Sequence, residues 1–140
     1  MNTKKNWTVW IMVLAFVAFG SAAWAAKGMQ MMAGKANPKA HATLTLTKTS
    51  LGIEARGLKP NSVFSVWLVN MTPKETMAGV GSPPYSFKSD SHGKCTYKAS
   101  LSEPPFGKWQ MVMVMLHPTG DPKDMENMVD ALSAKVPDAR

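Results

Sequence analysis

The sequence of 140 residues has only one cysteine, Cys95, and three histidines. An internal disulfide is therefore excluded, and the absence of a C-x-x-C-H motif excludes covalently attached haem. There is no G-x-S-x-G motif, and the histidines are not spaced as a Cys–His or Ser–His pair, so the sequence argues against an enzyme. Acidic residues number nine against 16 basic ones, which gives a net charge of +7. Because the basic residues are scattered singly, this charge favours a solvated surface over a nucleic-acid interface.

The N-terminal residues 1–26 are predicted to be a secretory signal peptide. Lys4 and Lys5 precede an uncharged apolar run over 7–20, and an A-x-A pattern follows at 23–25. This order of charge, apolar core and small residues is typical of export signals, so we expect a periplasmic or extracellular protein. The alternative is that the uncharged stretch 7–26, which at 20 residues is long enough to cross a bilayer as a helix, stays as an uncleaved anchor. Contact with a membrane is expected only in that case.

Residues 27–41, "KGMQMMAGKANPKAH", have no hydrophobic period and include Gly, Pro and Lys. They are predicted to form a flexible arm. Thioethers and imidazoles are good ligands for soft metals such as Cu(I). Met29, Met31, Met32 and His41 are therefore candidate copper ligands, with an ordinary linker as the alternative.

Residues 42–136 are predicted to form the folded domain. Apolar and polar residues alternate over 42–47 and again over 51–56, as in strands with one face in water. The segment 63–70, "VFSVWLVN", is apolar on both faces and predicts a central strand. "SDSHGK" at 89–94 predicts a hairpin turn, in which Gly93 can adopt a positive φ.

The C-terminal segment is predicted to be a short helix over about 121–135. Asp121 suits a helix cap, with Pro122 in the first turn. Apolar residues then recur at helical spacing at Met125, Met128, Val129 and Leu132. Together with the strands, this predicts a mainly β fold: a small antiparallel β-sandwich, immunoglobulin-like or related, with a C-terminal helix.

Several short motifs resemble the extracytoplasmic C-terminal domain of anti-sigma-K factors. They are G-L-K-P at 57–60, V-W-L-V at 66–69, A-G at 78–79, D-x-x-G at 90–93 and H-P-T-G at 117–120. The resemblance covers about residues 51–120 and implies a sandwich outside the membrane. It does not imply binding of a sigma factor, because only six residues precede the apolar run and His117 stands where that family usually has glutamate.

The segment 108–118, "KWQMVMVMLHP", alternates methionine with valine. In a strand, Trp109, Met111, Met113, Met115 and His117 would share one face. Because the opposite face is equally apolar, Met111 and Met113 are predicted to pack in the core or under the C-terminal helix. Met115 and His117, at the strand end, are the further candidate metal ligands.

Cys95 is predicted to face the core as an inert thiol, because it alternates in phase with Tyr97 and Leu101. The function predicted from the sequence is an exported, non-enzymatic binding or structural module with an envelope partner and without a cofactor. Two alternatives stay open. One is a periplasmic copper-binding protein that uses methionine and histidine, and the other is a membrane-tethered sensor domain.

Overall fold

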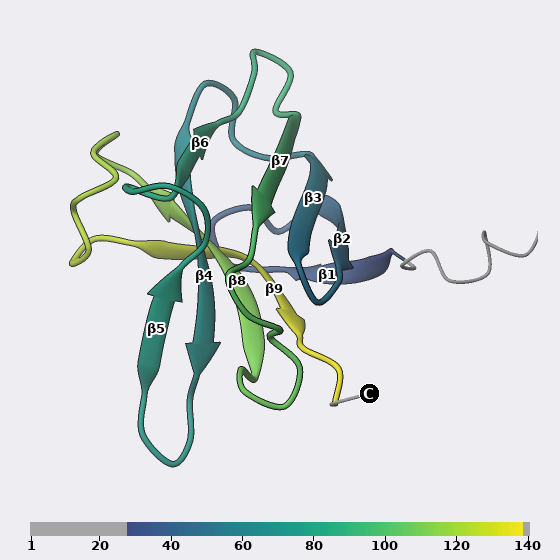
Figure 1. Cartoon of the computed structure of the whole chain (residues 1–140). Coiled ribbons are helices and arrows are strands. Elements are labelled where there is room, and N and C mark those ends of the chain that lie inside the picture. The colour runs from purple at the N-terminus through teal and green to yellow at the C-terminus, as the bar shows by residue number, and fades with distance from the viewer. Residues whose placement is uncertain (1–27, 139–140) are drawn as a thin grey trace, which may run out of the picture.

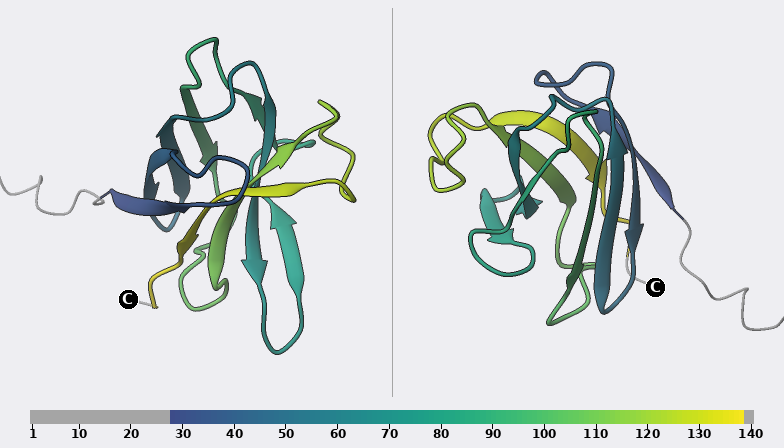
Figure 2. Two further views of the ribbon diagram at one scale, coloured as in Figure 1. Left: turned by 180° about the vertical axis from the view of Figure 1, so that it is seen from behind. Right: turned by 90° about the horizontal axis from the view of Figure 1, so that it is seen from above.

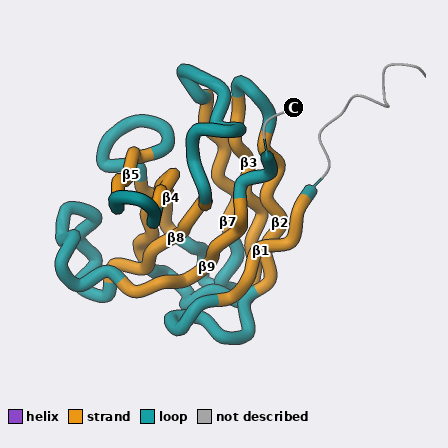
Figure 3. The backbone as a smooth tube through the Cα atoms, turned by 90° about the horizontal axis from the view of Figure 1, so that it is seen from below, coloured by secondary structure: helices purple, strands orange, loops and turns teal. Residues whose placement is uncertain are grey.

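The structure, a computed structural model, describes residues 28–138. The predicted signal peptide or anchor at 1–26 lies outside the described residues. Within them the chain forms strands and loops but no helix (Figure 3), so no helix there could cross a membrane. The strands are β1 (Met29–Ala33), β2 (His41–Leu46), β3 (Ser50–Arg56), β4 (Val63–Asn70), β5 (Thr76–Gly79), β6 (Ser86–Lys88), β7 (Cys95–Ser100), β8 (Met111–His117) and β9 (Val129–Lys135).

All strand pairs are antiparallel and form one sheet in the order β5-β4-β8-β9-β1-β2-β3-β7, with β6 also paired to β4. The sheet curls into a half-barrel (Figures 1 and 2). The curl places one half, β4–β5–β8–β9, opposite the other half, β2–β3–β7. β1 joins the two halves, because Met31 pairs with β2 while Met32 pairs with β9.

One hydrophobic core fills the inside of the curl and draws on both halves. Leu44 and Ile53 contribute from one half, and Val114 and Leu132 from the other; all four are fully buried. The predicted alternation in 42–47 and 51–56 is confirmed, since the buried residues of β2 and β3 alternate with exposed or half-exposed ones. The coarse prediction of a mainly β, antiparallel fold is therefore confirmed.

The two ends of the sheet approach each other through aromatic side chains. Phe87 of β6 lies 5.5 Å from Tyr97 of β7, measured between ring centroids, and the Tyr97 hydroxyl donates a hydrogen bond to the carbonyl of Val80. β6 and β7 are not paired with each other, however, because β6 pairs with β4 and β7 with β3. The predicted hairpin at 89–94 is therefore wrong: its turn is real, but it carries the chain from one end of the sheet to the other.

The turn at 89–94 is stabilised by Asp90 and depends on the glycine at position 93. The Asp90 carboxylate accepts hydrogen bonds from the backbone N–H groups of His92 and Lys94, at 2.8 and 2.9 Å. Gly93 has a φ of 75°, and a Cβ there would lie 2.2 Å from the carbonyl oxygen of Leu58. Only glycine fits that backbone without strain.

The predicted C-terminal helix is wrong. Residues 121–128 form turns, and the following segment is β9, paired with β8. Asp124 accepts hydrogen bonds from the backbone and side chain of Asn127, which favours local turns over a helix. The same segment also has the alternation of a strand, in which every second residue is apolar. Leu132, Ala134 and Val136 follow this alternation and are all buried. Pairing with the open side of β8 satisfies this pattern, and Met125 is left 43% exposed.

The predicted flexible arm is also wrong for most of residues 27–41. β1 lies in the middle of the sheet, and Met31 belongs to the core. Beyond β1, Gly34 and Ala36 donate backbone hydrogen bonds to Ala131 and Asp130, each at 2.9 Å. Without this segment, the facing edges of β2 and β9 would lack backbone partners.

Candidate functional site

The methionines of β8 lie on the outer face of the sheet. Their neighbours Val112, Val114 and Leu116 are buried in the core. Met111, Met113 and Met115 alternate with them, are half-buried, and lie outside the core cluster. The predicted separation of β8 into a valine side and a methionine side is confirmed, but neither core packing of Met111 and Met113 nor cover by a helix is found.

The register of the strands gathers further residues on this face. Directly paired residues of neighbouring strands point to the same side. Met113 pairs with Trp67 of β4, and Val69 pairs with both Met111 and Met77 of β5. On the other side of β8, Ser133 of β9 pairs with both Met113 and Met32. We call this surface the methionine face; its members are Met32, Met77, Met111, Met113, Met115 and Trp67.

Exposure varies across the methionine face. Met32 is 72% exposed and Met77 37%, whereas the three methionines of β8 are half-buried. Successive methionines on one strand are spaced by about 6.6 Å. A small ion on this face could therefore be reached by two adjacent thioethers of β8, with flexible side chains closing the remaining distance.

Trp67 borders the methionines and is held by an aromatic neighbour. Its ring meets that of Tyr85 edge-on, with centroids 5.4 Å apart. Tyr85 in turn lies over Gly79, where a Cβ would fall 2.1 Å from the tyrosine ring. Tyr85 itself has a φ of 64°, a left-handed conformation that costs about 1–3 kcal/mol in a residue with a side chain. Packing against Trp67 and Gly79 supports that conformation.

A chain of buried hydrogen bonds links Trp67, Ser65 and His117, close to Met115. Ser65 Oγ is 2.7 Å from His117 Nε2 and 2.7 Å from Trp67 Nε1. His117 Nδ1 is 3.2 Å from the carbonyl oxygen of Asp124. A carbonyl only accepts, so Nδ1 carries the proton, Nε2 accepts from the Ser65 hydroxyl, and Ser65 accepts from Trp67. All three side chains are satisfied and at most 9% exposed.

The hydrogen bonds of this network determine whether His117, a predicted metal ligand, can bind a metal. The residue lies on the same strand as Met115, two positions away, but is only 2% exposed. Since both ring nitrogens are engaged, the imidazole has no free lone pair to offer a metal. The structure therefore brings Met115 to an accessible position and makes His117 part of the support behind it.

The other predicted ligands are dispersed. Met29 and Met31 point inward, since Met31 is buried in the core and Met29 packs against it. Met32 points outward and joins the methionine face. His41 is exposed at the start of β2, in the other half of the sheet. Among residues 28–138, no group of three or more His, Cys, Asp or Glu side chains is placed to hold a metal ion.

Cys95 packs against the core from β7, as predicted. Burial raises the pKa of its thiol to about 12, and the nearby negative charge of Asp90 adds to the shift. A thiolate is the reactive form of cysteine, so the raised pKa favours the protonated, less reactive thiol at neutral pH. Trp109 departs from its predicted place: it precedes β8 and packs against the core rather than beside the methionines.

The sequence reasoning missed Ser65, Trp67 and Met77. A signal for the first two was present, because Ser65 is the one polar side chain before Asn70 in the strand 63–70, which is apolar on both faces. A buried hydroxyl must find hydrogen-bond partners, and Trp67, two residues along the same face, supplies one. Nothing in the sequence placed Met77 near Met111.

Comparison with known proteins gave no match: no family model fits the sequence, and neither a curated protein nor a solved structure is significantly similar. The resemblance to anti-sigma-K factors gains no support from this comparison and stays a prediction.

Proposed function

We propose that this chain is an exported, non-enzymatic binding module whose methionine face binds a soft metal ion, Cu(I). The observation that carries the proposal is the orientation of β8, which buries its valines and turns Met111, Met113 and Met115 outward. Methionine usually fills cores, so a half-exposed row of thioethers beside a tryptophan calls for a ligand. Thioether sulfur is a soft ligand that favours Cu(I).

In this proposal Met113 and Met115 are the principal ligands. They are adjacent on the outer side of β8, and Met113 is paired with Trp67. A cation held there would lie alongside the indole ring, whose face attracts positive charge. Met111, Met77 and Met32 flank this pair and supply further thioethers. The Ser65–His117 network fixes the indole through its N–H, which keeps the ring in place before the ion arrives.

The non-enzymatic part of the proposal is supported by the state of Ser65. A serine–histidine contact is found in hydrolases, but Ser65 is fully buried and its oxygen already accepts a hydrogen bond from Trp67. A nucleophile needs an open path to its substrate, and Ser65 has none.

Export and the finer fold class complete the proposal. The charge, apolar run and A-x-A pattern of the N-terminal segment support secretion. An oxidising compartment suits a chain with one thiol of low reactivity. The curled sheet, with its core between two opposed halves, is in this proposal an open relative of a two-layer β-sandwich.

The test is a Cu(I) titration under reducing conditions, with a chromophoric chelator as competitor. We expect the protein to bind with a dissociation constant of about 1 μM or less, equivalent to about −8 kcal/mol. The double variant Met113→Leu, Met115→Leu keeps apolar bulk but removes two sulfurs, and should weaken binding at least about tenfold. The matched control, Met29→Leu with Met31→Leu, changes two inward methionines and should bind as the parent does.

Two results would contradict the proposal. One is the absence of Cu(I) binding at micromolar concentrations. The other is an equal loss in both double variants, because it would show that the affinity does not reside on the methionine face. The broader prediction of a binding module for another ligand would then stand without copper.

A further inference from the structure

The outer face of the other half of the sheet is polar and hollowed. At one end Arg56 of β3 pairs with His41 of β2 and Lys94 directly precedes β7, while Thr96 of β7, Glu54 of β3 and Thr43 of β2 form the next row. All six side chains are exposed. The alternation of β2 and β3 that buries leucine and isoleucine inside leaves only polar groups outside.

Two open hollows, of about 670 and 630 Å³, lie along this face. Both are lined by Thr43, Glu54 and Thr96, so they are parts of one continuous depression across β2, β3 and β7. We call it the polar trough and define it by Thr43, Glu54, Arg56, Lys94, Thr96 and Lys98. Gly52 leaves room beside Lys98, whose Cγ would lie 4.0 Å from a Cβ placed there.

The lining of the trough is weakly positive, because Arg56, Lys94 and Lys98 outnumber the acids Glu54 and Asp90 by one charge. Arg56 and Lys94 lie at one end, and Lys98 lies about 13 Å further along the strands, four residues away in register. Glu54 is the one acid within the defined trough. Asp90 also lines its end, and backbone hydrogen bonds from Lys94 and His92 lower the pKa of its carboxyl, so its negative charge is retained beside Lys94. In residues 28–138 the one ion pair within 4 Å joins Lys108 to Glu103, and in the trough Lys94 and Asp90 interact through their charges without such a contact.

The lining also distinguishes between classes of ligand. It contains no Phe, Tyr or Trp among the described residues, so stacking on a neutral sugar or a base is not supported. The backbone beneath is already paired in the β2–β3 and β3–β7 ladders. A peptide could therefore add as a strand only at the outer edge of β7, the last strand of the sheet, and not across this face. What remains is recognition by charge and by short hydroxyl groups, which both donate and accept hydrogen bonds.

We propose that the polar trough binds an acidic polysaccharide, whose carboxylates meet Arg56, Lys94 and Lys98 and whose hydroxyls meet Thr43, Glu54 and Thr96. Arg56 can hold a carboxylate through two parallel hydrogen bonds. Cations at the two ends suit a polymer that repeats its charge along its length. This site is separate from the methionine face and does not depend on copper binding.

The experiment measures binding of alginate oligosaccharides, which carry a uronate on every residue, by calorimetry at low salt. Neutral dextran and polyglutamate serve as comparison ligands. We expect the oligosaccharide to bind, dextran not to bind, and polyglutamate to bind at least tenfold more weakly. Arg56→Gln with Lys94→Gln should weaken alginate binding at least tenfold, whereas Lys74→Gln with Lys123→Gln, an equal change of charge elsewhere, should change it less than twofold.

A second pair of variants separates recognition from general attraction between opposite charges. Thr43→Val with Thr96→Val keeps the charge and the β-branched shape of the strands, and should weaken alginate binding about fivefold. Thr76→Val, on β5 in the other half, is its control and should have no effect. Equal losses in the two charge variants, or equal binding of polyglutamate and alginate, would overturn the proposal.

Discussion

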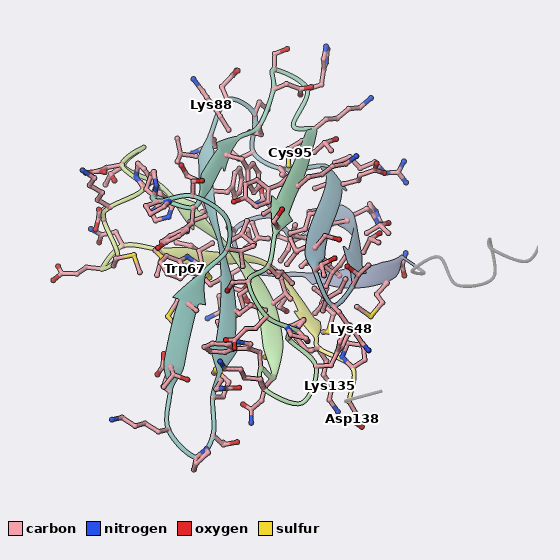
Figure 4. All side chains as sticks on the ribbon, viewed as in Figure 1. Lys48, Trp67, Lys88, Cys95, Lys135 and Asp138 are labelled. Atoms are coloured by element: carbon pink, nitrogen blue, oxygen red, sulfur yellow. The ribbon has the colours of Figure 1, made fainter. Side chains whose placement is uncertain are left out.

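The two halves of the curled sheet share one core but present opposite outer faces. On β2, β3 and β7 the outer residues are mostly exposed and polar, among them Thr43, Glu54 and Lys98. On β4 and β8 the outer residues are methionines, a tryptophan and a buried serine–histidine pair. Trp67 and Cys95 mark the two halves in Figure 4.

Loops account for the difference. The segment that contains Tyr85 packs against Trp67 of β4, and the segment that contains Asp124 meets His117 at the end of β8. β4 is therefore buried on both faces, as its sequence predicted. Where loops cover a strand, the outer face must be apolar or internally hydrogen-bonded. The half-exposed methionines lie at the border of that cover.

The largest expected effect tests whether the two halves do share one core. Ile53→Ala in β3 and Leu132→Ala in β9 each remove a fully buried side chain. Each should lower the free energy of unfolding by about 2–5 kcal/mol in denaturant titrations. A much smaller effect of Leu132→Ala would show that β9 is not part of the core and would restore the helix as an alternative.

A smaller effect is expected from the covered outer face. Ser65→Ala leaves Trp67 Nε1 and His117 Nε2 without partners in a buried site, and should cost about 1–3 kcal/mol of stability. Ser133→Ala, a half-buried serine on the same face, should change stability by less than about 0.5 kcal/mol. If the two variants were equally stable, the network would not be holding the covered face together.

The smallest expected effect is on the pH dependence of stability, and it arises from Cys95 on the inner side of β7. Its pKa is raised from an ordinary value of 9.0 to about 12. The thiol therefore ionises more readily in the unfolded chain, so its contribution to stability is complete below pH 9 and is lost as the pH rises toward 12. Unfolding measured between about pH 8 and pH 10.5 should lose stability more steeply in the parent than in Cys95→Ser. Identical pH dependence in the two proteins would show that the thiol is exposed.

The sequence was most informative where a local pattern matched the final environment. The alternation of apolar and polar residues predicted β2 and β3, and the run that is apolar on both faces predicted β4. The alternation that Cys95 shares with Tyr97 predicted that its side chain faces the core. The sequence misled where the partner was distant in the chain. The spacing of Met125, Met128, Val129 and Leu132 fits a helix, yet the unpaired edge of β8 made a strand the better solution.

In the candidate site, too, local patterns were predictable and contacts between distant segments were not. Alternation alone separated the methionines of β8 from its valines, but which side would face the core depended on how the sheet curls. That Met32, Met77 and Trp67 lie on the same face as Met113 depends on strand register between segments far apart in the sequence. Register of this kind is set by the whole sheet, so no local motif could have predicted it.

The most direct test of the central claim is a titration with Ag(I), a stable substitute for Cu(I), followed through the NMR signals of labelled methionine methyl groups. We expect the signals of Met113 and Met115 to shift first and those of Met29 and Met31, which point into the fold, to stay where they are. If no methyl signal shifted, or if the inward methionines shifted together with those of β8, the methionine face would not be a soft-metal site.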